Sequence, residues 1–184
     1  MLQYFYSAIL NRRHAAYVLA GSAMRLAVVM GLHLNVPRGQ LEDASVREHR
    51  IRLWWTAYTF DRMFSMNLGN PVAAPDDVID VGRPSNSEAL PAEDFTNTEY
   101  HCSRLSLAQI AGRIVQSIYV RKSTNGPPSA TLAQRVQEIL KSLHDWRENL
   151  PTNLSLDHSS VERRDATTLS LQLSFNQVCC HSCN

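Results

Sequence analysis

Three acidic residues follow a proline with a spacing that could hold a metal ion. In "DDVID", Asp76, Asp77 and Asp80 repeat the DDxxD pattern with which helical enzymes bind magnesium and, through it, a diphosphate group. Magnesium prefers several carboxylate oxygens at once, so these side chains would have to converge from one helix on an apolar cavity. Here they stand between Pro75 and Pro84, and no second acidic motif of this kind follows. We therefore favour solvated loop carboxylates, with Asp76 or Asp77 capping a short turn.

A second set of metal-ligand types stands in the final residues, "CCHSCN". Cys179, Cys180, His181 and Cys183 are of the types that bind zinc, but neighbours this close cannot all surround one tetrahedral ion. We expect buried or frayed thiols and no metal. The sequence also lacks a nucleophile elbow and a glycine-rich phosphate loop, with only seven glycines in total. We therefore expect no catalytic residue, no cofactor and no enzyme activity in this chain.

The stretch "EHRIRLWWTAYTFDRMFSMNL" places Asp61 and Arg62 beside two tryptophans in one predicted helix. One stripe of that helix carries Trp54, Tyr58, Asp61 and Ser65, and the next carries Trp55, Thr59, Arg62 and Met66. An unpaired buried carboxylate would cost roughly several kcal/mol, so Asp61 needs a partner. We expect Arg25, which interrupts the preceding apolar helix, to be that partner. Arg62 is the competitor, reaching Glu48 or the acidic loop.

The charge balance argues against a surface for nucleic acid. The 184 residues include 18 Lys and Arg against 17 Asp and Glu, so no overall positive field draws the chain to DNA. The basic run "REHRIR" contains Glu48 and lacks interleaved aromatic residues, which favours a solvated first helical turn. No stretch approaches the roughly 20 apolar residues of a membrane span, and we expect an intracellular protein without membrane contact.

Apolar residues recur at helical spacing through most of the sequence, which predicts an all-α, irregular multi-helix bundle. In the first helix, Gly31 ends the periodic pattern and Leu32 folds back on the last turn, while His33 lies near the helix C-terminus as a favourable dipole partner. The second helix begins near Ser45, with Glu48 completing a capping box. Three helices follow, within residues 100–122, 131–150 and 166–180. Their expected buried residues, with those of the first helix, are Ala16, Ala20, Ala23, Ala27, Met30, Leu107, Ile110, Ala111, Ile114, Ile118, Leu132, Val136, Ile139, Leu143 and Trp146.

Residues 69–97 form one long internal loop in this prediction, because Pro71, Pro75, Pro84 and Pro91 remove backbone donors and favour extended conformations. A loop of this length in a compact domain is usually functional or packed as a lid. With 44% hydrophobic and 19% charged residues, residues 1–184 suit a single domain.

Taken in order, these motifs resemble the fungal-specific transcription factor domain, the middle homology region of zinc-cluster transcription factors of the xylanolytic activator type. The resemblance covers almost the whole chain. It rests on "AGSAMRLAVVMGLHLN", on "EHRIRLWWTAYTFDRMFSMNLGNPVAAPDDVIDVGRPS" and on "LHDWRENLPTNL". The residues that match the family pattern are Ala23, Arg25, Ala27, Gly31, Leu32, His33, Glu48, Arg50, Trp54, Trp55, Asp61, Arg62, Pro71, Asp77 and Asp80. Two positions depart from it, since Asn70 replaces the usual arginine before Pro71, and Ile51 stands where a second arginine is common.

The resemblance implies a nuclear regulator of transcription whose binuclear zinc cluster binds DNA from a separate N-terminal module. No spaced C-x-x-C pattern precedes the domain, so we expect that module, with its zinc, to be missing and the domain to be truncated at both ends. The expected partners are DNA through the missing module, a small-molecule effector, co-regulators or the transcription machinery, and a second copy in a homodimer. The alternative is an all-helical magnesium-dependent enzyme of the terpenoid-synthase type that uses the DDVID loop.

Overall fold

A computed structural model of the chain describes residues 13–86, 97–119, 132–155 and 166–183. Within these ranges the chain is helical and contains no strand, which confirms the predicted all-α class. The longer helices are α2 (Arg13–Val29), α3 (Ala44–Leu68), α4 (Thr98–Ile114), α5 (Leu132–Glu148) and α6 (Ala166–Cys183). Short helical segments are η1 (Asp76–Val78), η2 (Val115–Tyr119) and η3 (Thr152–Leu154). No helix in the described ranges is long and apolar enough to cross a membrane.

Helix α2 ends as its sequence predicts. Gly31 adopts a φ of 65°, and its N–H donates to the carbonyl of Val28, while Leu32 donates to Ala27. This left-handed residue satisfies the last carbonyls of the helix, and Leu32 is buried against the preceding turns. The face of small residues is confirmed in part. Ala16, Ala20 and Ala27 are buried, but Ala23 is half-buried and Met30 is 61% exposed, and Met24 fills the core position instead.

Helix α3 begins one residue earlier than predicted and with a different cap. Asp43 accepts hydrogen bonds from the backbone N–H groups of Ser45 (2.8 Å) and Val46 (3.2 Å), so Asp43 is the N-cap and the predicted Ser45–Glu48 capping box is wrong. The reason is that Asp43 reaches the first free donors, which leaves Glu48 to interact elsewhere. Gly69, in the left-handed conformation, ends the helix after 25 residues.

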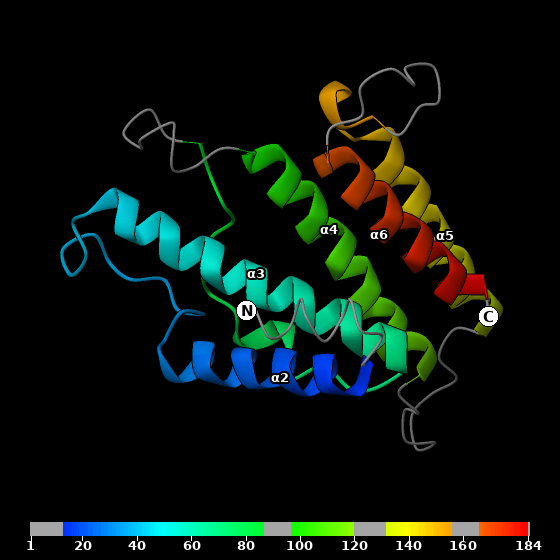
Figure 1. The fold of residues 1–184 in the computed structure, drawn as a ribbon, viewed down its shortest axis with the longest axis horizontal. Coiled ribbons are helices and arrows are strands. Elements are labelled where there is room, and N and C mark those ends of the chain that lie inside the picture. The colour runs from blue at the N-terminus through cyan, green and yellow to red at the C-terminus, as the bar shows by residue number, and fades with distance from the viewer. Residues whose placement is uncertain (1–12, 87–96, 120–131, 156–165, 184) are drawn as a thin grey trace.

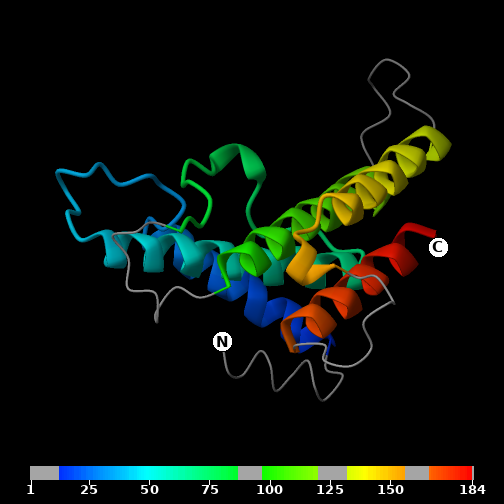
Figure 2. The same cartoon turned by 90° about the horizontal axis from the view of Figure 1, so that it is seen from above.

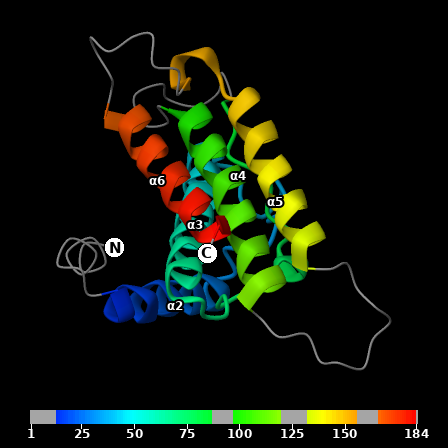
Figure 3. The same ribbon diagram turned by 90° about the vertical axis from the view of Figure 1, so that its right-hand side faces the viewer.

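Helices α3 and α4 lie at the centre of the bundle, with α2 packed along α3 and with α5 and α6 packed on α4 (Figure 1, Figure 3). Two main apolar clusters flank this central pair. One joins α2, α3 and α4 around the fully buried Trp54. The other joins α3, α4, α5 and α6, and Trp146 of α5 stacks there on Phe175 of α6 at 5.3 Å between ring centroids.

The predicted core positions of α4 and α5 are confirmed, apart from the start of α5. The buried residues are Leu107, Ile110, Ala111, Ile114, Ile139, Leu143 and Trp146. Leu132 is exposed and Val136 is half-buried. The side chain of Ile118 lies outside the described residues.

The segment after α3 reverses direction and runs back along that helix. We name residues 70–86 the return segment. Figure 2 shows it rising from the bundle beside α3 and returning to the start of α4, with η1 at its bend. It makes up most of the described portion of the predicted 69–97 loop; residues 87–96 lie outside the described part.

Candidate functional site

A row of polar and aromatic side chains on α3 holds the return segment. The residues of this row, which we name the α3 stripe, are Glu48, Arg52, Trp55, Tyr58, Arg62 and Ser65, spaced three or four apart so that they share one helix face. The start of α3 holds the end of the return segment, and the end of α3 holds its beginning. The return segment therefore runs antiparallel to α3, and the side chains of the stripe hold it there.

At the buried end of the stripe, two charged residues adjacent in sequence form an ion pair. Arg62 Nη1 lies 2.7 Å from Asp61 Oδ2, and both side chains are fully buried. Arg62 Nη2 donates to Asp76 Oδ1 of η1 at 2.7 Å, and the Tyr58 hydroxyl donates to the same oxygen at 2.9 Å. The guanidinium carbon of Arg62 also lies 4.2 Å from the centre of the Tyr58 ring, a cation–π contact. We name Tyr58, Asp61, Arg62 and Asp76 the buried cluster.

The buried cluster also bonds the backbone of the return segment. The N–H of Ala73 donates to both oxygens of Asp61, at 3.2 and 3.0 Å, and the carbonyl of Ala74 accepts from Arg62 at 2.6 Å. A loop buried against a helix leaves backbone donors and acceptors that water cannot reach, and here charged side chains satisfy them. Helix α4 approaches Arg62 through Gly112, where an added Cβ would lie only 2.9 Å from Arg62 Cδ.

Burial and neighbouring charges shift the titration of the buried cluster. Burial raises the pKa of Tyr58 to about 12, against the opposing charge of Arg62. Burial also raises the pKa of Asp61, although the N–H of Ala73 and the charge of Arg62 favour the carboxylate. For Arg62, burial disfavours the cation, but Tyr58, Asp76 and Asp61 together raise its pKa above the usual value. At neutral pH Tyr58 therefore stays protonated and Arg62 stays charged. Both side chains can then hold the return segment through hydrogen bonds.

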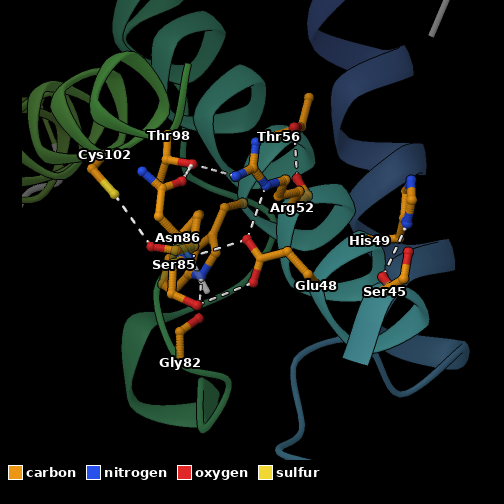
Figure 4. Close-up of polar contacts among 12 residues, drawn as sticks. Ser45, Glu48, His49, Arg52, Thr56, Gly82, Ser85, Asn86, Thr98 and Cys102 are labelled. Carbon is orange, nitrogen blue, oxygen red and sulfur yellow. Dashed lines mark hydrogen bonds and ion pairs between the residues drawn. The ribbon is translucent and has the colours of Figure 1, made fainter. Parts of the chain in front are cut away.

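At the other end of the stripe, Glu48 and Arg52 hold the end of the return segment to the start of α4 (Figure 4). Glu48, almost fully buried, accepts from Arg52 Nε at 2.9 Å and from the N–H of Ser85 at 3.1 Å. Arg52 donates to the hydroxyl of Thr98, the first residue of α4, and that hydroxyl donates to the side chain of Asn86. We name these five residues the outer cluster.

Between the two clusters, single hydrogen bonds continue the attachment. The indole N–H of Trp55 donates to the carbonyl of Gly82 at 2.7 Å. Near the beginning of the return segment, the carbonyl of Pro71 accepts from the Tyr17 hydroxyl of α2 at 2.8 Å and from the Ser65 hydroxyl at 3.3 Å. Together with the bond from Thr98 of α4 to Asn86, these bonds fix the return segment to helices α2, α3 and α4.

The predicted ion pair between Arg25 and Asp61 is wrong. Arg25 is exposed on α2 beside Gly21, and it forms no ion pair with any carboxylate in the described ranges. It contributes only a weak favourable charge to Asp61. The reason is geometric, since Arg62 and the N–H of Ala73 already occupy the carboxylate oxygens. The alternative expectation that Arg62 reaches the acidic loop is confirmed, whereas its predicted contact with Glu48 is replaced by Arg52.

The DDVID residues separate instead of converging. Asp76 binds Arg62 and Tyr58, Asp77 is exposed on η1, and the N–H of Asp80 donates to the carbonyl of His33 at 2.9 Å. Among the residues that the structure describes, no group of three or more His, Cys, Asp or Glu side chains could hold a metal ion. The turn-capping role expected for Asp76 or Asp77 is also wrong, because the cap residue of η1 is Pro75 and no side chain caps that turn.

The basic run of α3 is bound to the chain itself and does not form a solvated first turn. Arg50 Nη2 donates to the carbonyl of Gly31 at 3.1 Å, and Arg47 donates to the carbonyl of Leu41. Arg52 bonds to Glu48 and Thr98 in the outer cluster. Each of the three arginines therefore bonds to a different part of the chain. His33 is placed near the end of α2 as predicted, and its ring lies 5.7 Å from that of Trp54.

The cysteine cluster lies on α6. Cys179 is half-buried against the core and Cys180 is exposed, while the side chain of Cys183 lies outside the described residues. Side chains at adjacent positions on a helix point in different directions, so these two thiols face different surroundings.

Tyr58, Arg52, Ser85 and Thr98 belong to the site, but the sequence reasoning did not select them for it. The sequence does contain a signal for this site, namely the spacing of Glu48, Arg52, Trp55, Tyr58 and Arg62. Polar and aromatic residues at steps of three and four predict one shared face. The family-motif residues Glu48, Trp55, Asp61, Arg62 and Pro71 are brought together along this face, whereas Arg25 and Asp77 remain apart from it.

Residues 1–148 match the family described as fungal specific transcription factor domain. This chain belongs to that family. The match includes α2, α3, the return segment and α4, and so all residues of both clusters.

Similar proteins are fungal regulators of transcription. An uncharacterised transcriptional regulatory protein of Schizosaccharomyces pombe is 26% identical over 80% of this chain and 18% of its own length. The thiamine repressible genes regulatory protein of the same yeast is 28% identical over 86% of this chain and 20% of its own length. An ABC-transporter-regulating transcription factor of Aspergillus fumigatus is 26% identical over 78% of this chain and 16% of its own length. The chain thus spans about a fifth of the length of these relatives. No solved structure matches it.

Proposed function

We propose that this chain is the regulatory, middle homology region of a zinc-cluster transcription regulator. The observation that carries the proposal is the match of residues 1–148 to the fungal transcription factor domain, together with relatives that are regulators of transcription. In this proposal the chain acts in the nucleus, on the transcription of genes, and without catalysis. The DNA-binding zinc cluster belongs to a separate part of the full-length protein.

The charges on α3 support a role that does not involve direct contact with DNA. Arg50, Arg52 and Arg62 each bond to groups of the chain itself, so they do not form an open row of cations for phosphates. The formal net charge of the chain is only +1. DNA affinity depends strongly on such cations and on their release of counterions. We therefore assign DNA recognition to the separate module and regulation to this one.

The clusters on α3 suggest how such a module could work. The return segment follows α3 and is held by hydrogen bonds to three helices. An effector or a co-regulator that binds more tightly to one arrangement of these elements would shift the population of that arrangement. Regulation then requires a binding partner and no chemical reaction.

A tethering experiment tests this function. The chain would be inserted between an unrelated DNA-binding domain and an acidic activation segment, and reporter expression would be measured in yeast. A flexible Gly/Ser linker of equal length would replace the chain in the control. We expect reporter output to differ from that of the linker control at equal amounts of fusion protein. Equal output from the two fusions would contradict the proposal.

A binding experiment tests the absence of direct DNA contact. The purified chain would be titrated against genomic DNA fragments at several salt concentrations. We expect no sequence preference and only weak retention that disappears as salt increases. Selective binding to one fragment at physiological salt would contradict the assignment of DNA recognition to a separate module.

A further inference from the structure

A cavity of about 560 Å³ lies between α3 and α6, with the start of α2 and the side of α4 at its edges. Figure 3 shows α6 passing over α3 with α4 beside it. Pockets that bind small organic molecules commonly have volumes of about 300–1,000 Å³. The α3 stripe and its two clusters do not line this cavity, so it is a separate feature of the fold.

One wall of the cavity is apolar. It consists of Phe60 and Met63, both buried, and of Phe64, which is half-buried. Phe60 packs against the small residues Ala16 and Ala20 of α2, and Phe64 packs against the same cluster. This packing fixes the aromatic rings, so the wall is preformed and could accept an aliphatic or aromatic group without rearrangement.

The remaining walls carry positive charge. The cations that line the cavity are Arg13 and Arg104, with His181 beside them, and no described residue of its lining is an aspartate or glutamate. Arg104 forms no ion pair with a carboxylate in the described part of the chain, and its Nε–H is buried without a hydrogen-bond acceptor. Its guanidinium carbon lies 5.1 Å from the centre of the Phe60 ring, and Nη1 lies 3.4 Å from the Tyr100 hydroxyl.

The histidines near the cavity do not compensate this charge. Burial and the charges of Arg52 and Arg104 lower the pKa of the neighbouring His101. On the far side of the cavity, burial and the charge of Arg13 lower the pKa of His181. A buried donor without an acceptor and a cation without a counterion each cost free energy, and a bound anion would relieve both costs.

We propose that this cavity binds an organic anion in which one carboxylate is joined to an aliphatic or aromatic body. The carboxylate faces Arg104, whose fork of N–H groups matches two carboxylate oxygens. The body lies against Phe60, Met63 and Phe64. This site goes beyond the proposed function, because its ligand can be measured on the purified chain whatever the result of the reporter experiment.

Titration calorimetry with three probes tests the site. The probes are 4-phenylbutyrate, its neutral amide and inorganic phosphate. We expect 4-phenylbutyrate to bind, with the amide weaker by about ten-fold or more because the charged contact is lost. Inorganic phosphate should not bind measurably, because it lacks the apolar body. Equal affinities of the acid and the amide, binding of phosphate alone, or no binding of 4-phenylbutyrate up to about 10 mM would overturn the proposal.

Substitutions then locate the binding site. Arg104→Gln removes the charge and should weaken 4-phenylbutyrate binding by about ten-fold or more, whereas Arg104→Lys should retain part of it. Arg113→Gln is the matched control, since Arg113 is exposed on the same helix and lines a different groove. Circular dichroism checks that each variant is folded. If Arg104→Gln does not fold, Phe64→Ala replaces it, because it removes part of the apolar wall and should also weaken 4-phenylbutyrate binding. Equal losses in the test and control variants, or no loss in the test variant, would overturn the site.

Discussion

Asp61 and Arg62 are adjacent in the chain, and their side chains form a fully buried ion pair with Nη1 and Oδ2 2.7 Å apart. The pair does not join two helices. Each member instead extends to the return segment, Asp61 to the N–H of Ala73 and Arg62 to Ala74 and Asp76. Charge in the middle of an apolar helix therefore serves to bury a loop whose backbone groups would otherwise lack partners.

Glu48→Gln tests the outer cluster. The substitution removes the negative charge opposite Arg52 but keeps an oxygen that can accept from the N–H of Ser85. We expect a loss of about 1–3 kcal/mol in the free energy of unfolding, because a hydrogen bond to a charged group becomes neutral at an almost buried site. Urea denaturation measures it. Glu148→Gln, at an exposed carboxylate, should change stability by less than about 0.5 kcal/mol. Similar effects of the two substitutions would show that the outer cluster does not stabilise the folded chain.

Gly112→Ala tests the approach of α4 to Arg62. The new Cβ would lie 2.9 Å from Cδ and 3.2 Å from Nε of Arg62, and that side chain is held by its ion pairs and cannot swing away. We expect a loss of about 1–3 kcal/mol in the free energy of unfolding from overpacking. Gly82→Ala is the control, since nothing lies within 4 Å of the added methyl group. A neutral or stabilising effect of Gly112→Ala would show that Arg62 is free to move.

Tyr58→Phe tests the pH dependence of the buried cluster. Folding raises the pKa of Tyr58 from 10.0 to about 12, so the folded state holds the proton more tightly than the unfolded state. This contribution to stability is fully present below pH 10 and is lost as the pH rises from 10 to 12. Relative to wild type, the Phe variant should lack an alkaline loss of up to about 2–3 kcal/mol. Denaturation curves at intervals between pH 9 and 12 measure it. Parallel pH profiles for the two proteins would contradict the raised pKa.

The helices and their ends were largely predictable, because they depend on local residues. Gly31 ends α2 through its own conformation, and the apolar spacing of α4 specifies its buried face. The start of α3 was less certain, since Asp43 and Ser45 are both good cap residues and only the geometry decides between them. An error of this kind moves the N-cap by two residues and leaves the fold unchanged.

The sequence offers only alternatives for the partners of the charged residues, because these partners depend on the path of the return segment. The acidic loop is one of two alternatives for Arg62, and the reversal at Gly69 brings Asp76 of that loop to it. Arg25 looked like a partner for Asp61 because both interrupt apolar helices, but a shared pattern does not establish proximity. Adjacent residues such as Asp61 and Arg62 usually point in different directions on a helix. Their contact required side-chain conformations that only the packed structure specifies.

The most direct test of the account compares two double-mutant cycles in urea denaturation. One combines Asp61→Asn with Arg62→Met, and the other combines Asp61→Asn with Arg25→Met. We expect Arg62→Met alone to cost about 3–5 kcal/mol, because it leaves a buried carboxylate unpaired. The coupling energy between Asp61 and Arg62 should be about 1.5–3 kcal/mol, and that between Asp61 and Arg25 below about 0.5 kcal/mol. A coupling to Arg62 below about 0.5 kcal/mol, or a coupling to Arg25 of equal size, would contradict the buried cluster as the anchor of the return segment.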